Sequence, residues 1–143
     1  MQKTILTIAA VVFVTIVVGI VVLVAPFMYL GVKSRQQQQA LQNRTDFSEI
    51  AKAGARLARS FTNDNPLVFP TNSIVPPLLR SLSPSYLSVE SNHVTMEFHG
   101  GFDHYGYHIR QSGTNPALWS ISWYTEHGER FLTNIVTSEK VSQ

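Results

Sequence analysis

A long apolar segment near the N-terminus limits what this chain can fold into more than any other feature. The residues from Ile5 to Val32 include no charged side chain and are dominated by Val, Ile and Leu. A helix of roughly 20 apolar residues crosses the hydrocarbon core of a bilayer, and this segment is longer than that. Lipid can surround such a helix, because it satisfies its own backbone hydrogen bonds. The sequence therefore predicts a short tail over residues 1–4 and a transmembrane helix over residues 5–32.

A cleaved signal peptide is the alternative interpretation of this segment. Signal peptides have apolar cores of roughly 7–15 residues and end at a cleavage site of small residues. The segment here is longer, and its best-placed small residue, Ala25, is followed by Pro26, which is unfavourable after a cleavage point. We therefore interpret the segment as the uncleaved signal-anchor of a single-pass membrane protein. Pro26 is expected to kink or end the regular helix.

The basic residues beside the segment leave the orientation of the chain open. Lys3 precedes the segment, whereas Lys33 and Arg35 follow it. Positive residues close to a span tend to remain on the cytoplasmic side. Because the counts on the two sides nearly balance, the sequence predicts a membrane location without choosing the side of the C-terminal domain.

Composition excludes several classes of function for the rest of the chain. The chain has no cysteine, which excludes disulfide bonds, cysteine zinc sites and thiol nucleophiles. Its net charge is +2 and only 14% of its residues are charged, far from the basic density of a nucleic-acid-binding protein. Residues 33–45 are a polar juxtamembrane linker with four consecutive glutamines. This linker suits either a continued helix or a loose stalk.

A second helix is predicted directly after the linker. Asp46 and Glu49 have the spacing of a capping box, with Asp46 as the N-cap. Apolar residues then follow at helical spacing and predict an amphipathic helix of about four turns. The residues of this apolar face are Phe47, Ile50, Gly54, Leu57 and Phe61, with Ala51 and Ala58 beside them. Gly54 is unfavourable in a helix, so we expect it to allow close packing against a neighbouring element.

Basic side chains near the span and on this helix are candidates for contact with anionic lipid headgroups. They are Lys33, Arg35, Lys52, Arg56 and Arg59. The last three lie on the polar side of the amphipathic helix. The alternative is that they form an ordinary solvated surface.

The remaining sequence changes from helical to strand periodicity. Residues 73–82 suggest a short helix with Ser73 as its cap and two prolines in its first turn. Four strands with short connections follow, over residues 86–90, 93–99, 104–111 and 118–125, and residues 130–136 are a possible fifth strand at the edge. We predict an α+β domain over residues 46–136, with the amphipathic helix packed on a four-stranded antiparallel β-meander. A flexible tail is expected over residues 137–143.

Strand alternation predicts the core of this domain. The inward-facing residues are expected to be Leu87, Val89, Val94, Met96, Phe98, Tyr105, Tyr107, Ile109, Trp119, Ile121 and Trp123. The aromatic members are interpreted as core rather than as the walls of a ligand groove, because buried aromatic rings dominate core energetics without any ligand. Gly106 falls between two tyrosines and predicts a bulge or a close backbone approach.

The overall plan, an apolar N-terminal helix, a second helix and an antiparallel meander, resembles that of type IV pilins and pseudopilins. Those proteins carry a short leader that ends in Gly before an aromatic residue or Met, and a Glu within the apolar segment. The first acidic residue of this chain is Asp46. The resemblance is therefore limited to the plan, and the sequence assigns no family.

The hairpin from His99 to His108 is the most unusual segment in composition. If the apolar residues of its strands point inward, their polar neighbours share the outer face, with His99 opposite His104 and Glu97 opposite Gly106. The candidate metal ligands gathered there are Glu97, His99, Asp103, His104 and His108. Imidazole and carboxylate groups suit zinc or another divalent transition metal. The alternatives are a solvated sheet face, or catalysis with His99 or His104 as a base, for which no nucleophile is evident.

The function that the sequence favours is non-enzymatic. We predict a tethered interaction or scaffold domain that is held near the bilayer and binds a protein partner of unspecified identity, without nucleic acid and without a cofactor. The second hypothesis is a membrane-tethered metal-binding or hydrolytic domain that uses the histidine hairpin, with a divalent transition metal such as zinc.

Overall fold

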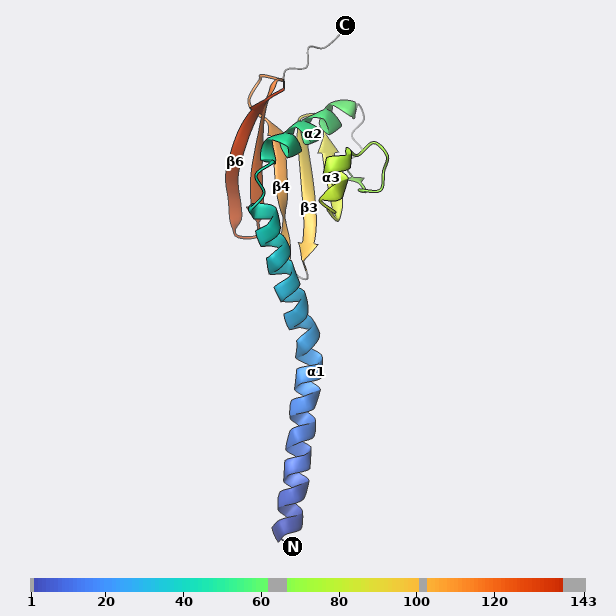
Figure 1. Ribbon diagram of the computed structural model, residues 1–143, viewed down its shortest axis with the longest axis vertical. Coiled ribbons are helices and arrows are strands. Elements are labelled where there is room, and N and C mark those ends of the chain that lie inside the picture. The colour runs from blue at the N-terminus through green and yellow to red at the C-terminus, as the bar shows by residue number, and fades with distance from the viewer. Residues whose placement is uncertain (1, 62–66, 101–102, 138–143) are drawn as a thin grey trace.

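A long helix projects from an α+β domain (Figure 1). The structure, a computed structural model, describes residues 2–61, 67–100 and 103–137, without the side chains of residues 2–6. Most of the predicted tail and the central two residues of the histidine hairpin lie outside the described residues. The predicted class, an apolar N-terminal helix followed by an α+β domain with an antiparallel sheet, is confirmed.

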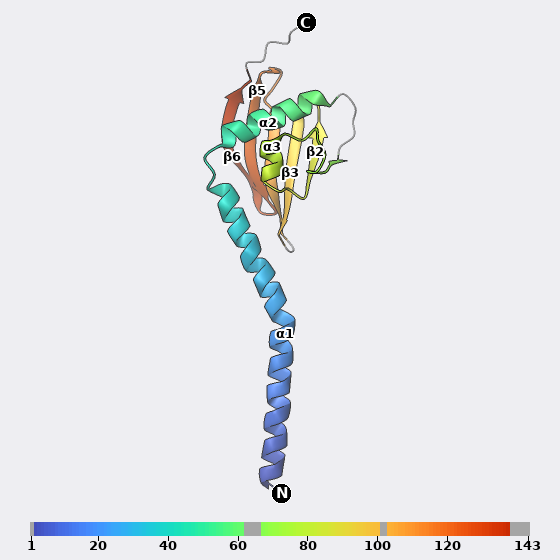
Figure 2. The ribbon, with the colours of Figure 1, turned by 45° about the vertical axis from the view of Figure 1, so that its right-hand side comes forward.

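Helix α1 (Gln2–Gln42) is one continuous element. It begins inside the predicted tail and continues through Pro26, so the proline does not end the helix. It also continues through the glutamines, which decides the open alternative for residues 33–45 in favour of a helix as far as Gln42. At about 1.5 Å of rise per residue, α1 is about 60 Å long. It curves along its length (Figure 2).

From Thr7 onward, the apolar part of α1 projects away from the domain. Every side chain from Thr7 to Lys33 is exposed, and the apolar part of the helix has a mean hydropathy of 3.2. The helix is therefore long and apolar enough to span a membrane.

The last turns of α1 belong to the domain. Ser34 and Leu41 are buried, with 2% and 6% of their surface exposed. Ser34 lies so close to Gly100 that a Cβ atom on the glycine would overlap it. The hydroxyl of Tyr107 donates a hydrogen bond of 2.7 Å to the carbonyl of Leu41. The apolar helix and the sheet are thus joined by buried contacts as well as by the chain itself.

Over the residues that the structure describes, the sheet has six strands, so the predicted count of four was wrong. All neighbouring strands are antiparallel, in the order β1-β2-β3-β4-β5-β6. Their bounds are β1 (Leu67–Val68), β2 (Tyr86–Glu90), β3 (His93–Gly100), β4 (Asp103–Gln111), β5 (Leu118–Thr125) and β6 (Gly128–Val136). β1 was missed because two residues cannot show alternation. β6 corresponds to the possible fifth strand, but its pattern is weak because Ile135 is its single buried residue.

Helix α2 (Phe47–Ser60) covers the inner face of the sheet, as predicted. Its predicted capping box was wrong, although Asp46 does precede the first helical residue. The Asp46 carboxylate instead accepts a hydrogen bond from Arg44 at 2.8 Å, and Glu49 pairs with Lys52 at 3.0 Å. The backbone conformation of Asp46, with φ −95° and ψ 29°, differs from the extended form that a capping side chain requires.

Helix α3 (Pro77–Ser81) is shorter than the predicted helix over residues 73–82. The side chain of Asn72 accepts a hydrogen bond from the backbone N–H of Ile74 at 3.1 Å and makes a turn where the helix was expected. Pro76 has an extended backbone, with ψ 142°, and the helix therefore starts only after it. The prolines still occupy the helix start, where a missing N–H costs nothing.

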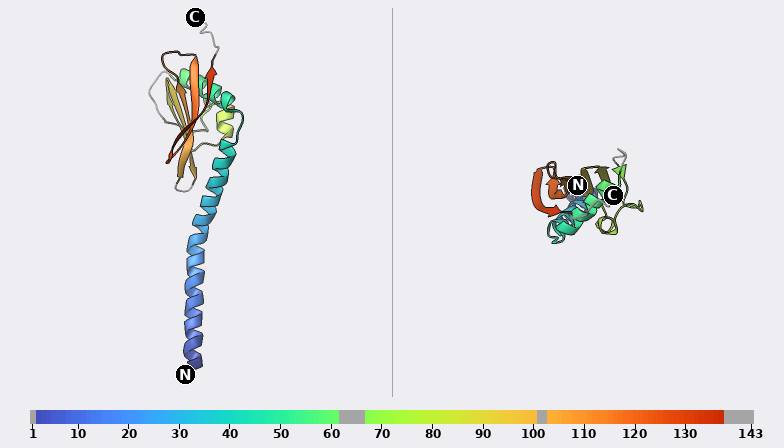
Figure 3. Two further views of the ribbon diagram at one scale, coloured as in Figure 1. Left: turned by 90° about the vertical axis from the view of Figure 1, so that its left-hand side faces the viewer. Right: turned by 90° about the horizontal axis from the view of Figure 1, so that it is seen from above.

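The two faces of the sheet are very different. Each of the predicted inward-facing strand residues is buried, and together with α2 and α3 they form the core. Figure 3 shows both helices on one side of the sheet, whereas its other side is not covered by any described element. We call this second side the open face.

Gly54 allows α2 to lie close to the sheet. A Cβ atom at this position would overlap the side chain of Ile109 on β4, chiefly its Cδ1 atom. The close approach predicted from the sequence is therefore confirmed. Substitution with alanine sets two effects against each other, because alanine is about 1 kcal/mol better than glycine in a helix, whereas overpacking a core costs about 1–3 kcal/mol.

We expect Gly54→Ala to lower the free energy of unfolding by up to about 2 kcal/mol, because overpacking outweighs helix propensity at this contact. Ile109→Val removes the Cδ1 atom and should recover part of this loss in the double variant. Denaturant unfolding in detergent, followed by the fluorescence of Trp119 and Trp123, measures both effects. A Gly54→Ala protein more stable than the wild type would contradict this account.

Candidate functional site

The open face of the sheet gathers most of the polar side chains that the strands carry. Alternation along each strand directs them away from α2 and the core. Four of the five histidines of the chain belong to strands that contribute to this face. The residues whose side chains make polar contacts there are Tyr86, His93, Thr95, Glu97, His99, His104, His108, Arg110, Ser120, Ser122, Tyr124 and Glu129. They form two clusters.

The Glu97 cluster consists of Glu97, His99 and His104. As predicted, His99 pairs with His104 across the β3–β4 hairpin, and Glu97 pairs with Gly106. The Nε2 atom of His99 lies 2.9 Å from Oε1 of Glu97, and the Nδ1 atom of His104 lies 2.7 Å from the same oxygen. The two imidazole rings meet edge to face, with centroids 4.8 Å apart. Both histidines therefore converge on one carboxylate oxygen.

Two tyrosines hold the other oxygen of the same carboxylate. The hydroxyl of Tyr86, directly opposite Glu97 on β2, donates a short hydrogen bond to Oε2. The hydroxyl of Tyr124 on β5 donates to Oε2 at 3.4 Å. The side chain of Glu97 is consequently only 13% exposed, although it lies on an uncovered sheet face.

These contacts alter the acidity of the groups involved. Burial alone would raise the pKa of Glu97, but hydrogen bonds from Tyr86, His104 and His99 outweigh it and hold this pKa below its usual range. The hydrogen bond to Glu97, followed by burial, raises the pKa of Tyr86 to about 12. Burial and the nearby negative charge of Glu97 also raise the pKa of Tyr124. Glu97 is therefore a carboxylate at neutral pH, and both tyrosines are donors.

The structure brings together three of the five predicted metal ligands. Among the residues that the structure describes, Glu97, His99 and His104 are the one group of three metal-ligating side chains whose ligand atoms all lie within 4.8 Å of one another. Asp103 instead faces α1, where its Oδ2 atom lies 3.5 Å from Ser34 Oγ and from Gln38 Nε2. The fifth predicted ligand, His108, belongs to the second cluster.

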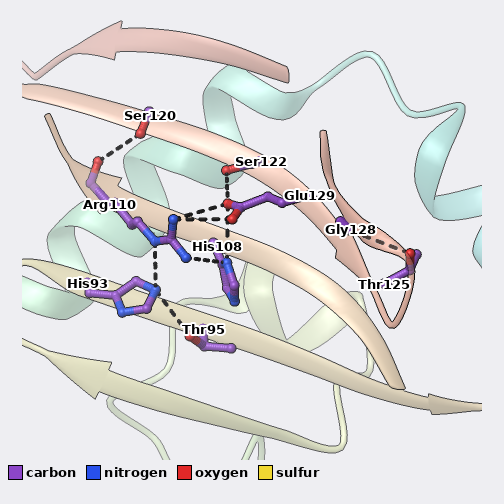
Figure 4. Close-up of polar contacts among 9 residues, drawn as sticks. All are labelled: His93, Thr95, His108, Arg110, Ser120, Ser122, Thr125, Gly128 and Glu129. Carbon is purple, nitrogen blue, oxygen red and sulfur yellow. Dashed lines mark hydrogen bonds and ion pairs between the residues drawn. The ribbon is translucent and has the colours of Figure 1, made fainter. Parts of the chain in front are cut away.

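The Arg110 cluster consists of His93, His108, Arg110 and Glu129 (Figure 4). Nη1 of Arg110 forms an ion pair with Glu129 at 3.2 Å. Its Nη2 lies 2.6 Å from Nδ1 of His108, and its Nε lies 3.4 Å from Nε2 of His93. The hydroxyl of Ser122 donates to Oε1 of Glu129 at 2.6 Å. A guanidinium group thus occupies the centre of this cluster.

Burial and charge act together on the histidines of the Arg110 cluster. Burial, and then the positive charge of Arg110, lower the pKa values of His93 and His108. For Glu129, burial raises the pKa, but hydrogen bonds from Ser122 and His108 and the charge of Arg110 outweigh it and lower the pKa overall. At neutral pH the cluster therefore contains two neutral imidazoles and an arginine–glutamate ion pair.

Tyr124 connects the two clusters. Its ring stacks on His108, with centroids 4.2 Å apart and an interplanar angle of 19°, while its hydroxyl reaches Glu97. Gly106 makes room for this arrangement, because a Cβ atom there would overlap the carbonyl of Met96 and lie 3.0 Å from the Tyr124 ring. The sequence predicted a bulge or a close backbone approach at this glycine, and the close approach is confirmed.

Sequence reasoning did not identify Tyr86, Tyr124, Arg110 and Glu129 as members of the site. The position of Tyr86 could have been predicted from the sequence, since the short β2–β3 turn fixes the register that places Tyr86 directly opposite Glu97. The position of Glu129 could not have been predicted, because it depends on β6 and on the register shift between Ile121 and Ser122, where β5 pairs with β6.

The candidate headgroup-binding residues lie in two places. Lys33 and Arg35 are exposed on α1 at the end of the apolar segment. Figure 2 shows α2, which carries Lys52, Arg56 and Arg59, across the part of the domain farther from the N-terminus of α1. Arg59 hydrogen-bonds the carbonyl of Pro116 at 2.9 Å. The structure therefore separates these three residues from the apolar segment.

Comparison with known proteins provides no further assignment. No protein-family model, no curated protein and no solved structure matches this chain.

The lowered pKa of His108 predicts a pH dependence of stability. A group whose pKa is lower in the folded state binds protons more readily when unfolded, so its contribution is present above about pH 6.5 and is lost as the pH falls through the folded-state value. We expect the free energy of unfolding to decrease between pH 7 and pH 5, and His108→Gln to make this decrease shallower, by at most about 1.4 kcal/mol per pH unit.

Denaturant unfolding in detergent at several pH values, followed by tryptophan fluorescence, measures this slope. His127→Gln is the matched control, because His127 lies in the β5–β6 turn, outside both clusters. If His127→Gln changes the slope as much as His108→Gln does, the Arg110 cluster is not the source of the dependence.

Proposed function

We propose that this protein is a single-pass membrane-anchored, non-enzymatic binding module that holds the open face of its sheet close to the bilayer. The observation that carries this proposal is the continuity of α1, which is fully exposed and apolar over its first part and buried in the domain at Ser34 and Leu41. In water, an exposed apolar surface of this size is unfavourable, whereas in lipid it is the expected surface of a spanning helix.

The position of the domain relative to the bilayer follows from the contacts of Ser34. This residue comes two positions after Val32, where the apolar segment ends. It contacts Gly100 and Asp103, the last and first residues of β3 and β4. With the apolar segment in lipid, the hairpin end of the sheet lies beside the membrane surface, and this arrangement can be followed in Figure 1.

Lys33 and Arg35 are the residues that we propose for contact with lipid headgroups. They follow the apolar segment directly and are exposed. A basic residue close to an anionic membrane surface contributes about 1 kcal/mol to binding. Lys52, Arg56 and Arg59 on α2 reach the same surface only if the domain tilts strongly, so we assign them to the solvated surface.

The open face is the surface that we propose for a protein partner. Its polar side chains are held by hydrogen bonds within the two clusters, so binding there orders few additional side chains. It also presents Tyr86, Tyr124 and Arg110, and tyrosine and arginine are residue types enriched at protein interfaces. No described element of this chain covers it.

Charged substitutions within the apolar segment test the anchor. Val14→Arg with Val18→Arg places two charges near the middle of the segment, where each costs about 2.5–3.5 kcal/mol of insertion free energy. We expect the wild-type protein to remain with membranes during alkaline carbonate extraction and a large part of the variant to be released.

Gln36→Arg with Gln39→Arg is the matched control for the anchor, because it adds the same charges at exposed positions beyond the segment. This control should stay with the membranes. Release of the wild-type protein, or equal retention of the Val14→Arg, Val18→Arg protein, would contradict a transmembrane anchor.

Site-specific photo-crosslinking in native membranes tests the binding surface. A photo-reactive amino acid in place of Thr95 lies on the open face, between His93 and Glu97, whereas one in place of Ser48 lies on the exposed side of α2. We expect a discrete protein adduct from position 95 and little from position 48. Equal crosslinking from both positions would argue against a preferred surface.

A further inference from the structure

We propose that Glu97, His99 and His104 form a binding site for a divalent transition metal, with zinc as the best fit. The site goes beyond the proposed anchored module and does not depend on the anchor. Its basis is geometric, because Nε2 of His99 and Nδ1 of His104 both lie within 3 Å of Oε1 of Glu97, and all three ligand atoms lie within 4.8 Å of one another.

The spacing of these atoms is close to what a bound ion requires. Zinc binds imidazole nitrogen and carboxylate oxygen at about 2.0–2.2 Å in tetrahedral geometry, which places neighbouring ligand atoms about 3.4 Å apart. The present separations from Glu97 are 2.9 and 2.7 Å. An ion therefore needs the imidazoles to move outward by about half an ångström or slightly more. The side chains of His99 and His104 are 44% and 59% exposed, which leaves room for this movement.

The set of ligands fits zinc and leaves one position open. Two imidazoles and one carboxylate are three of the usual four ligands, and a water molecule or a group from a partner supplies the fourth. Copper and nickel also accept this combination of ligands. Magnesium and calcium prefer sites made of oxygen ligands, so two imidazoles disfavour them.

The surroundings of Glu97 orient its carboxylate for this role. Tyr86 and Tyr124 donate to Oε2 and so direct Oε1 toward the two histidines. Hydrogen bonds of this kind, from residues behind a ligand, fix its orientation in metal sites, and their loss typically weakens metal binding by 10- to 100-fold. The backbone N–H of His99 donates to Oγ of Ser85 at 3.1 Å, which also fixes the end of β3.

The Arg110 cluster is a comparable group whose centre already holds a positively charged side chain. It also contains two histidines and a glutamate, on the same face of the same sheet. Arg110, however, contacts His93, His108 and Glu129, and its fixed positive charge repels a cation at close range. The two clusters therefore form a matched pair within one protein, in which only the Glu97 cluster has a centre free of a fixed positive charge.

Titration of the full-length protein in detergent with Zn²⁺ and Co²⁺ tests the site. The protein must carry no histidine tag. We expect one Zn²⁺ per chain by calorimetry, and a visible absorption spectrum typical of tetrahedral coordination with Co²⁺. His99→Ala and His104→Ala should each weaken binding at least about tenfold, since each removes one of three ligands. Glu97→Gln should do the same, whereas Tyr86→Phe should weaken binding by at most about tenfold, the lower end of the range for such hydrogen bonds, because Tyr124 still donates to the same oxygen.

The control is His93→Ala with His108→Ala, which removes the same residue types from the Arg110 cluster and should change the affinity less than twofold. Tryptophan fluorescence and unfolding confirm that each variant is folded, and the exposed positions of His99 and His104 make this expected. Absence of stoichiometric binding by the wild-type protein would overturn the proposal. Equal loss of binding in the control would also overturn it, because it would show non-specific binding to surface histidines.

Discussion

The arrangement of this protein depends on the contact between the last turns of α1 and the sheet. Ser34 packs against Gly100, and the backbone carbonyl of Leu41 accepts a hydrogen bond from the hydroxyl of Tyr107. One helix thereby has two environments, fully exposed over its apolar part and buried at its end. The orientation of the sheet relative to the apolar segment follows from this contact, and so does the position of the hairpin that carries the Glu97 cluster.

The open face shows how the same residue types acquire different properties within one sheet. Both clusters contain two histidines and a glutamate that is held by hydroxyl groups. In the Arg110 cluster the guanidinium group forms an ion pair with Glu129, and burial together with the guanidinium charge lowers the pKa values of His93 and His108. In the Glu97 cluster two tyrosines satisfy one oxygen and leave the other to the histidines. The two clusters therefore differ in the group that faces the glutamate carboxylate, which is a guanidinium group in one and two tyrosine hydroxyls in the other.

Much of the domain could be predicted from the sequence, because an element with one buried face carries apolar residues at regular intervals. The inner face of the sheet and the apolar side of α2 were identified residue by residue, since each has one buried face and a strong alternation. The pairing of His99 with His104 was predicted because a short turn fixes the register of the two strands that it joins. The close packing at Gly54 and Gly106 was signalled by glycine in places where it is otherwise unfavourable.

The features that could not be predicted either show no regular spacing of apolar residues or depend on contacts with residues far away in the sequence. β1 is too short to alternate, and β6 is too exposed. The capping box failed because Arg44 competes for the Asp46 carboxylate, and Asp103 left the predicted ligand set because α1 passes beside it. By itself, the sequence determined the apolar helix, the buried face of α2 and of the four predicted strands, and the hairpin register, since these follow from local hydrophobic patterning and a short turn. Only the tertiary structure decided that Glu97, His99 and His104 converge while His108 pairs with Arg110 and Glu129, because side-chain contacts between strands depend on which elements meet.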